Sequence, residues 1–213
     1  MTLVLLIMAA YLVGSISPSV FLGRLVRHVD VRQHGSGNAG TTNAFRVLGP
    51  GLGTVVLVGD VLKGFLPVVI ARDLVPPWGV TLVALAALAG HNWSVFLRGR
   101  GGKGVATGAG TILAMMPWIL VLLVAAFAVV LAVSATVSLA SLTAAILFPL
   151  LSLATGRPLA YDLYAFAGAA IVFWGHRGNI RRLIRREEPH IRLPWRRGPN
   201  PPSTAPPKVH GRG

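Results

Sequence analysis

The sequence has 213 residues, of which 54% are hydrophobic and 12% charged, and its mean hydropathy of +0.67 excludes a soluble domain of this length and predicts a protein of the lipid bilayer. Its formal net charge is +14, and in so hydrophobic a chain this excess indicates cytoplasmic loops beside anionic lipid headgroups rather than nucleic-acid binding. Cysteine is absent from the sequence, which excludes disulfides, thiolate metal sites and a cysteine nucleophile.

The apolar runs predict an all-α integral membrane protein with seven transmembrane helices. In chain order these runs lie at about 2–23, 51–71, 78–97, 104–116, 117–134, 137–155 and 159–175. All but the fourth approach the length that crosses a hydrocarbon core of roughly 30 Å. The first run has no Lys or Arg before Arg24, so we interpret it as a retained helix and not as a signal peptide. The combined run 104–134 is too long for one straight span, so we predict two helices that meet at Pro117.

The positions of the basic residues predict the orientation of the helices. Cations follow the first span at Arg24, Arg27, Arg32 and Arg46, follow the third at Arg98, Arg100 and Lys103, and recur from Arg181 onward. Basic loops stay in the cytoplasm. Seven spans with the N-terminus outside and the C-terminus in the cytoplasm place all three groups inside, whereas six spans would place the basic tail outside.

The chain divides into a single membrane domain over residues 1–190 and a tail over 191–213. The tail is rich in Pro, Gly and Arg and has no apolar periodicity, so we expect it to be disordered near the headgroups.

Three polar segments share the cytoplasmic face in this topology. They are "GSGNAGTTNAFR" at 35–46, "GRGGKGVAT" at 99–107 and "GHRGNIRRL" at 175–183. Glycine lets backbone amides surround an anion, Ser, Thr and Asn add neutral donors, and Lys or Arg adds charge. We therefore expect a phosphate-binding site on this face, and we expect it to lack carboxylates.

Two soluble phosphate-binding templates fail on their context. Gly35, Gly37 and Gly40 spell G-x-G-x-x-G, but Asp60 falls within an apolar run and no βαβ unit surrounds the motif. A Walker A loop fails because Lys103 is followed by Gly104 in place of Ser or Thr. Taken singly, the glycines are equally typical of loop turns and close helix packing; three such segments on one face favour a phosphate site.

Together the segments resemble the bacterial acyl-phosphate:glycerol-3-phosphate acyltransferases, the PlsY family. The family signatures, approximately S-G-N-x-G-A-T-N-x-x-R, G-G-K-G-V-A-T and H-R-x-N-I-x-R-L, are similar to residues 36–46, 101–107 and 176–183. The resemblance continues to about Pro189 and includes "GDVLKG" at 59–64 and "GHNWSVFL" at 90–97. The sequence departs from the family signatures at three places. Thr41 stands where Ala is usual, Arg98-Gly99-Arg100 precedes the second motif, and Arg186-Glu187 stands where Gly-Thr is usual before Glu188.

This resemblance implies acyl transfer from a fatty acyl phosphate to the 1-hydroxyl of sn-glycerol 3-phosphate, which yields lysophosphatidic acid and inorganic phosphate. Both substrates carry phosphate, as the glycine-rich segments require. The resemblance also implies a multi-pass protein of the cell membrane whose active site faces the cytoplasm. We expect no cofactor, no metal and no nucleic-acid partner; acyl chain length and oligomeric state stay open.

Lys103 is our candidate for the clamp on the donor phosphate. A short helix predicted to begin near Gly104 would add its N-terminal amides, with Gly102 and Thr107 beside it. The other expected phosphate cradle consists of Ser36, Gly37, Asn38, Gly40, Thr42, Asn43 and Arg46. In that cradle Arg46 would bind phosphate in bidentate fashion, and the hydroxyl and amide side chains would donate to substrate oxygens.

His176 and Asn179 are three residues apart and would face the same way at a helix start. His176 is either a general base on the acceptor hydroxyl or a positioning group, and we favour positioning because an acyl phosphate is already activated. For Asp60 and Lys63 we favour a structural ion pair within the membrane slightly over a role in the site, and for His91 a satisfied polar contact over a metal ligand.

Two other function classes fit parts of the pattern. A lipid phosphatase or phosphotransferase would need Asp-rich metal motifs or a Lys, Arg-Pro and His, Asp set, and only fragments such as "GRP" at 156–158 occur. A membrane transporter of a phosphate-bearing anion is the alternative, although such sites tend to lie near the midplane between inverted repeats.

Overall fold

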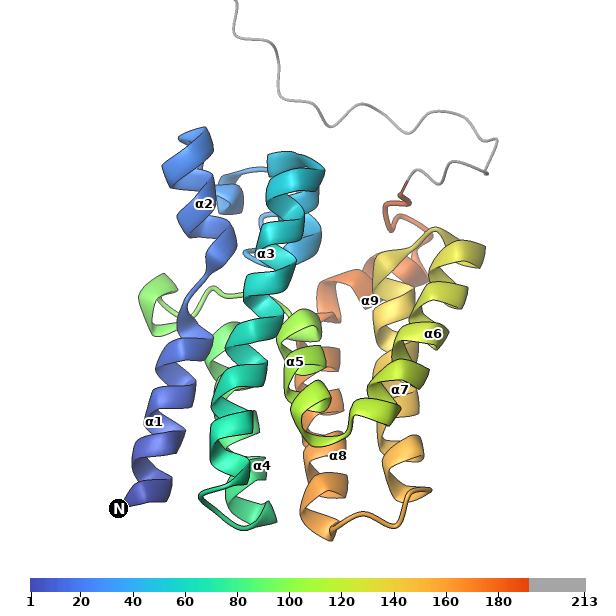
Figure 1. The fold of residues 1–213 in the computed structure, drawn as a ribbon. Coiled ribbons are helices and arrows are strands. Elements are labelled where there is room, and N and C mark those ends of the chain that lie inside the picture. Colours follow the sequence, from blue (N-terminus) through green and yellow to red (C-terminus); the bar gives the residue numbers. More distant parts are fainter. Residues whose placement is uncertain (192–213) are drawn as a thin grey trace, which may run out of the picture.

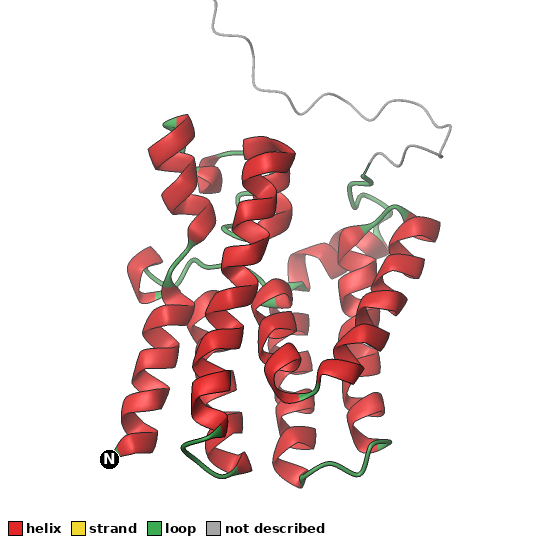
Figure 2. Cartoon of the chain, viewed as in Figure 1, coloured by secondary structure: helices red, strands yellow, loops and turns green. Residues whose placement is uncertain are grey.

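The computed structural model describes residues 1–191, and those residues form helices and loops without strands (Figure 2). The expectations for residues 192–213 lie outside this range. The helices are α1 (Thr2–Ser15), α2 (Pro18–Arg27), η1 (Val31–Gln33), α3 (Thr41–Arg72), α4 (Pro77–Asn92), η2 (Val95–Leu97), α5 (Val105–Met115), α6 (Pro117–Ser134), α7 (Val137–Leu153), α8 (Leu159–Gly175) and α9 (Arg177–Ile184).

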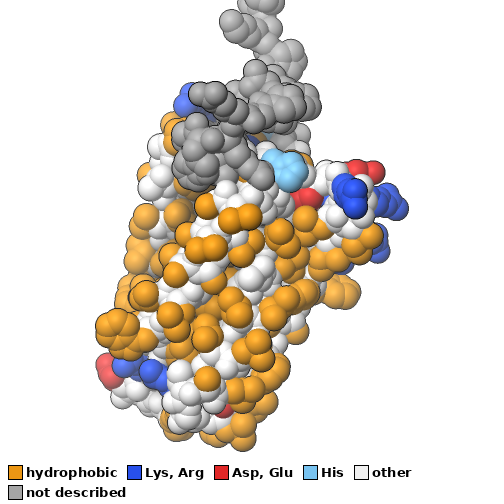
Figure 3. All heavy atoms as spheres, turned by 90° about the vertical axis from the view of Figure 1, so that its right-hand side faces the viewer, with side chains coloured by type: hydrophobic (Ala, Val, Ile, Leu, Met, Phe, Trp, Pro, Cys, Tyr) orange, Lys and Arg blue, Asp and Glu red, His pale blue; other side chains and the backbone are white. Residues whose placement is uncertain are grey.

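The long helices stand side by side in alternating directions (Figure 1). α1 packs against α4, α3 against α5, and α6 against α7, while α8 contacts both α4 and α7. Hydrophobic side chains cover the face seen in Figure 3, and the charged side chains on it gather at its two ends. This distribution suits a helical bundle whose middle contacts hydrocarbon and whose ends contact water.

Length and hydropathy identify four segments that could cross a membrane: Thr2–Arg27, Thr41–Arg72, Pro77–Leu97 and Pro117–Ser134. Three further apolar helices, α5, α7 and α8, are shorter. The predicted all-α class is confirmed over residues 1–191, whereas the predicted number of seven spans stays a prediction.

The first apolar run is not the single helix that the sequence predicts over 2–23. α1 ends at Ser15, and α2 begins at Pro18, whose fixed φ suits the first helical position. The carbonyl oxygen of Ile16, at this break, accepts a hydrogen bond of 2.7 Å from the ammonium of Lys63. The break therefore survives in an apolar surrounding because α3 supplies the missing donor.

α3 folds back on itself at its N-terminal end. Gly49 has φ +84°, and the helix bends sharply there. The hydroxyl of Thr41 donates to Oδ2 of Asp60 at 2.8 Å, although 19 residues of straight helix would separate these positions by about 28 Å. The bend thus brings the first polar segment against the middle of its own helix.

The predicted ion pair between Asp60 and Lys63 is present, with Oδ1 and Nζ 2.8 Å apart and both side chains buried. His91 Nδ1 lies 3.6 Å from the same carboxylate oxygen and has no hydrogen-bond partner among residues 1–191. The polar contact expected for His91 is present as this approach to the Asp60 carboxylate, at a distance longer than that of an ordinary hydrogen bond.

The predicted division at Pro117 is confirmed, since α5 ends at Met115 and α6 begins at the proline. α5 packs directly on the backbone of α3. A Cβ atom at Gly64 would lie 2.1 Å from the carbonyl oxygen of Thr107, and one at Gly110 would lie 2.0 Å from that of Val61. These glycines let the short helix α5 lie close against α3, and this packing fixes the position of the N-terminus of α5.

Candidate active site

The three polar segments meet around one cleft of about 440 Å³. Its lining comes from the loop before α3, the loop before α5 and the junction of α8 with α9, together with the end of α4. The lining residues are Ser36, Gly37, Asn38, Asn92, Trp93, Gly99, Arg100, Gly101, Gly102, Lys103, Trp174, Gly175, Arg177, Gly178, Asn179, Arg181 and Arg182. The expected proximity of the segments is thus confirmed.

The second loop is fastened to the C-terminal end of α4. The amide of Gly101 donates to the Asn92 carbonyl at 3.2 Å, and the amide of Gly102 donates to the His91 carbonyl at 3.0 Å. A Cβ at Gly101 would lie 1.9 Å from the His91 oxygen, and one at Gly102 would lie 2.0 Å from His91 Nε2. Only glycine allows the backbone at positions 101 and 102 to come this close to His91, and Lys103 follows directly in the chain.

The first loop is shaped by two asparagines. Asn43 is 1% exposed; its Oδ1 accepts from the Ser36 amide at 2.8 Å, and its Nδ2 donates to the carbonyls of Val31 and His34. Asn38 accepts from a backbone amide of its own loop at 2.9 Å and donates to the Gly101 carbonyl at 3.4 Å. Asn43 therefore orders the first loop internally, and Asn38 links it to the second.

A buried hydrogen-bond network holds Lys103 in place. Its Nζ donates to Oδ1 of Asn179 at 2.6 Å, and Nδ2 of Asn179 donates to Glu188 Oε1 at 2.5 Å. Glu188 is 8% exposed and also accepts from Ser138 and Arg182, each at 2.7 Å. The carboxylate thus determines which way the Asn179 amide faces, and its oxygen is directed to the ammonium.

The cleft is electropositive. Burial is the main cause that lowers the pKa of Lys103 to about 8; the charges of Arg182 and Arg46 lower it too, and Glu188 opposes them. α5 begins at Val105, two residues after Lys103, so the amides of its first turn, which have no partner within the helix, follow Lys103 closely in the chain. A phosphate bound in the cleft would meet the ammonium of Lys103 and the guanidinium groups of the lining arginines.

His176 lies between α8 and α9, is 3% exposed, and places Nδ1 2.8 Å from the Val172 carbonyl. A carbonyl oxygen only accepts, so Nδ1 carries the proton and Nε2 carries a lone pair. Burial is the main cause that lowers the pKa of His176 to about 4, helped by Lys103 and opposed by the Val172 hydrogen bond and Glu188. The imidazole is therefore neutral near pH 7.

Residues 4–186 match the profile of a family described as "Glycerol-3-phosphate acyltransferase". The chain belongs to this family. A glycerol-3-phosphate acyltransferase of Rubrobacter xylanophilus is 46% identical over 87% of this chain and 93% of its own length. One of Thioalkalivibrio sulfidiphilus is 44% identical over 87% and 92%.

A solved structure has the same fold. It is described as a crystal structure of PlsY (YgiH), an integral membrane glycerol 3-phosphate acyltransferase, in its glycerol 3-phosphate form. The TM-score is 0.87 at 36% identity, with 90% of this chain and 96% of that chain covered. A lysophosphatidic acid form of PlsY matches with a TM-score of 0.85. The membrane character of the family therefore agrees with the apolar helices seen here.

Within this acyltransferase fold, only part of the expected site lines the cleft. The expected residues that do so are Ser36, Gly37, Asn38, Gly102, Lys103 and Asn179. Those outside the lining are Gly40, Thr42, Asn43, Arg46, Gly104, Thr107 and His176. Thr107 is fully buried and Arg46 is exposed, but the charge of Arg46 still acts on Lys103. Their roles toward substrate stay predictions.

No acidic side chain of residues 1–191 lines the cleft, but the carboxylate of Glu188 bonds to the lining residue Asn179 from beyond α9. Glu188 follows the third polar segment in the sequence, so the sequence pattern did not indicate that it lies near Lys103. Sequence reasoning also passed over the lining residues Asn92, Trp93, Arg100, Trp174, Arg177, Arg181 and Arg182. The arginines of α9 lie within the third polar segment, but nothing in the sequence assigns any one of them an individual role.

Proposed function

We propose that this membrane protein transfers a fatty acyl group from acyl phosphate to the 1-hydroxyl of sn-glycerol 3-phosphate. The products are lysophosphatidic acid and inorganic phosphate, the first acylation of phospholipid synthesis. The convergence of three glycine-containing segments on Lys103, in a chain that belongs to the glycerol-3-phosphate acyltransferases, carries this proposal. The solved PlsY forms with glycerol 3-phosphate and lysophosphatidic acid correspond to one substrate and one product of it.

The acyl phosphate is already activated, so the protein has to hold the two substrates in position and does not have to form a covalent intermediate. The 1-hydroxyl oxygen attacks the carbonyl carbon, the bond from that carbon to the phosphate oxygen breaks, and a phosphate oxygen takes up the hydroxyl proton. Lys103 and the first turn of α5 stabilise the departing phosphate, and the donors of Ser36 and Asn38 hold substrate oxygens. No residue of the chain has to be acylated in this sequence of events.

His176 positions the acceptor in this proposal. A neutral imidazole with a pKa of about 4 is a weak base, but its Nε2 lone pair can accept a hydrogen bond from the substrate hydroxyl. His176→Asn should therefore retain more activity than His176→Ala. Loss of a titration near neutral pH in His176→Asn would instead identify the imidazole as the base.

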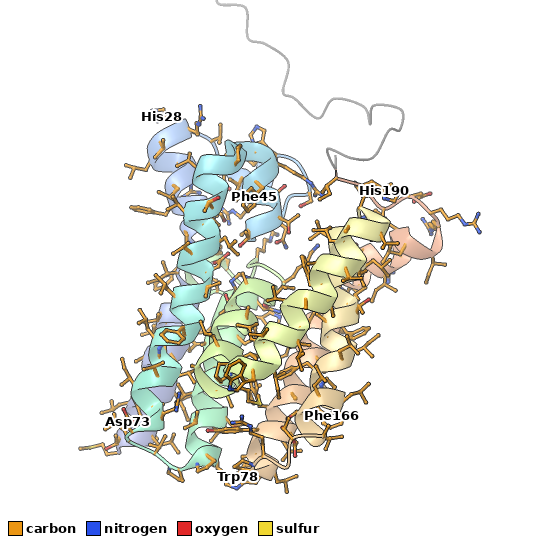
Figure 4. All side chains as sticks on the ribbon, turned by 45° about the vertical axis from the view of Figure 1, so that its right-hand side comes forward. His28, Phe45, Asp73, Trp78, Phe166 and His190 are labelled. Carbon is orange, nitrogen blue, oxygen red and sulfur yellow. The ribbon has the colours of Figure 1, made fainter. Side chains whose placement is uncertain are left out.

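We further propose that the protein lies in the cell membrane with seven spans. Its N-terminus is outside, and its active site faces the cytoplasm. The basic α2 and α9 lie toward the end marked by His28 and His190 in Figure 4, opposite Asp73 and Trp78, which supports one cytoplasmic face. Cysteines introduced at Ser36 and Arg100 should resist an impermeant thiol reagent in intact cells. Labelling of either from outside would overturn this orientation.

The direct test supplies purified protein in detergent with labelled glycerol 3-phosphate and either an acyl phosphate or an acyl thioester. We expect labelled lysophosphatidic acid with the acyl phosphate. An anion transporter would form no product under these conditions, and turnover with the thioester alone would overturn the proposed donor.

Variants of Lys103 connect the activity with the cleft. A charge-assisted contact to phosphate in a partly shielded site contributes roughly 2–4 kcal/mol, so Lys103→Ala should lower kcat/KM by about thirty- to a thousandfold. Lys103→Arg should recover only part of this loss, because its planar fork replaces a compact ammonium between two glycines. Near-normal turnover of folded Lys103→Ala would contradict the proposed site.

A further inference from the structure

Thr41 begins α3 directly after the first loop, and no step of the proposed reaction uses its hydroxyl. The hydroxyl donates to Oδ2 of Asp60 at 2.8 Å, and Asp60 is 1% exposed. A hydrogen bond to a buried carboxylate is stronger than one between neutral groups, because the acceptor is charged and shielded from water. Thr41 is also one of the three places where the sequence departs from the family signatures, so those signatures assign it no role. The hydroxyl fastens the end of the first loop to the middle of α3.

The first loop connects this fastening point with the cleft. Asn38, which lines the cleft, stands three residues before Thr41. Its Oδ1 accepts from the amide of Gly40 at 2.9 Å, and its Nδ2 donates to the carbonyl of Gly101 at 3.4 Å. Only this short hydrogen-bonded turn separates Asn38 from Thr41. A displacement of Thr41 would therefore displace a side chain of the cleft.

The other oxygen of Asp60 faces the second loop. Oδ1 lies 2.8 Å from the ammonium of Lys63 and 3.6 Å from Nδ1 of His91. Nε2 of the same imidazole lies against Gly102, where a Cβ would be 2.0 Å away, and the His91 carbonyl accepts from the Gly102 amide at 3.0 Å. Gly102 lines the cleft and directly precedes Lys103. The carboxylate thus stands between the two loops, with one oxygen directed toward each.

The two loops also contact each other, which closes these contacts into a ring. Asn38 bonds to Gly101, and a Cβ at Gly40 would lie 3.8 Å from Cα of Gly102. A closed ring through Asp60 fixes the distance between the loops as well as the place of each. In a reaction between two bound substrates, that distance decides how well the reacting groups are aligned.

We propose that Thr41 is a positioning residue, whose hydrogen bond to Asp60 holds the first loop where it binds glycerol 3-phosphate. This inference rests on the proposed function, in which Lys103 binds the donor phosphate and the first loop is left for the acceptor. Thr41 acts through Ser36 and Asn38, since it lies outside the cleft lining itself. The hydrogen bonds that hold Lys103 and its loop do not include Thr41. Loss of the hydroxyl should therefore weaken binding of glycerol 3-phosphate more than binding of the acyl phosphate.

The first measurement compares the kinetics of three variants at equal concentration of folded protein. Thr41→Val keeps the shape but removes the hydroxyl, and we expect KM for glycerol 3-phosphate to rise about three- to thirtyfold while KM for the acyl phosphate changes little. Thr41→Ser keeps the hydroxyl and should return KM to near its wild-type value. Thr54→Val is the matched control, because it removes an exposed hydroxyl of the same helix that bonds to the Pro50 carbonyl. Its kinetics should equal those of wild type.

A purely structural role would lower Tm but leave KM of the folded molecules unchanged. KM for glycerol 3-phosphate within about twofold of wild type in Thr41→Val would therefore overturn the proposal. An equal rise in Thr41→Ser would overturn it as well, because the hydroxyl would not be the group that matters. A rise in KM for the acyl phosphate as large as that for glycerol 3-phosphate would overturn the assignment to the first loop.

The second measurement needs no turnover and separates this inference from the proposed function. A ligand that binds only the folded state raises Tm. Glycerol 3-phosphate should raise the Tm of wild type and of Thr41→Ser, and should raise that of Thr41→Val only at higher concentration. If this pattern holds while wild type forms no lysophosphatidic acid, the proposed function fails and the positioning role stands. If wild type forms lysophosphatidic acid and all three proteins respond to glycerol 3-phosphate alike, the positioning role fails and the proposed function stands.

Discussion

Glu188 offers a sharp test of the network behind Lys103, through the substitution Glu188→Gln. The carboxylate accepts hydrogen bonds from Asn179, Ser138 and Arg182. Burial acts to raise the pKa of Glu188, but these hydrogen bonds outweigh it and the pKa lies below its usual value. The acid is therefore ionised at neutral pH. Glutamine keeps the shape but removes the charge and directs an NH₂ group at one of three donors.

The size of the effect follows from these contacts. One hydrogen bond to a charged group contributes about 1.5–3 kcal/mol, which corresponds to a factor of roughly ten to a hundred and fifty. We expect Glu188→Gln to lower kcat/KM by about this factor at equal concentration of folded protein, because the Asn179 oxygen is no longer directed to Lys103. Tm should fall as well. Asn179→Ala should then add little to the loss, since both changes disrupt one network.

The assay is lysophosphatidic acid formation from labelled glycerol 3-phosphate, with folded protein quantified by gel filtration and thermal unfolding. Glu187→Gln is the control, because this neighbouring acid is exposed. Activity of folded Glu188→Gln within twofold of wild type would refute the role assigned to the carboxylate.

Three further expectations concern Lys103, the glycines and the C-terminal tail. The lowered pKa of Lys103, about 8, predicts that kcat/KM falls as the pH rises through that value and the ammonium loses its proton; in Lys103→Arg the pH profile should stay flat there. Gly102→Ala should abolish most activity and lower Tm, because its Cβ would lie 2.0 Å from His91 Nε2, whereas Gly51→Ala, with no atom within 4 Å, should be neutral or slightly stabilising. Deletion of residues 195–213 should change turnover per folded molecule by no more than a few-fold, and a hundredfold loss would show that the tail takes part in catalysis.

Part of the candidate site could be predicted from the sequence because its signals are local. Glycines beside Lys103 and the run of donors after Gly35 are visible without any fold, and positive charges after apolar runs place these segments on one face. The structure brings these segments around one cleft. The positions of the asparagines in the sequence did not indicate which groups their side-chain amides would bond. Asn43 and Asn179 have the same side chain, yet one is bonded to three backbone groups and the other joins Lys103 to a carboxylate.

The sequence by itself determined the helical membrane class and the division at Pro117, since hydropathy and a missing amide hydrogen act over a few neighbouring residues. Tertiary structure alone decided the bend at Gly49, which sets Thr41 against Asp60, and the approach of Glu188 to the cleft. These features depend on which backbones come close together. Such proximity arises from packing across tens of residues, and the order of side chains along the chain does not encode it locally.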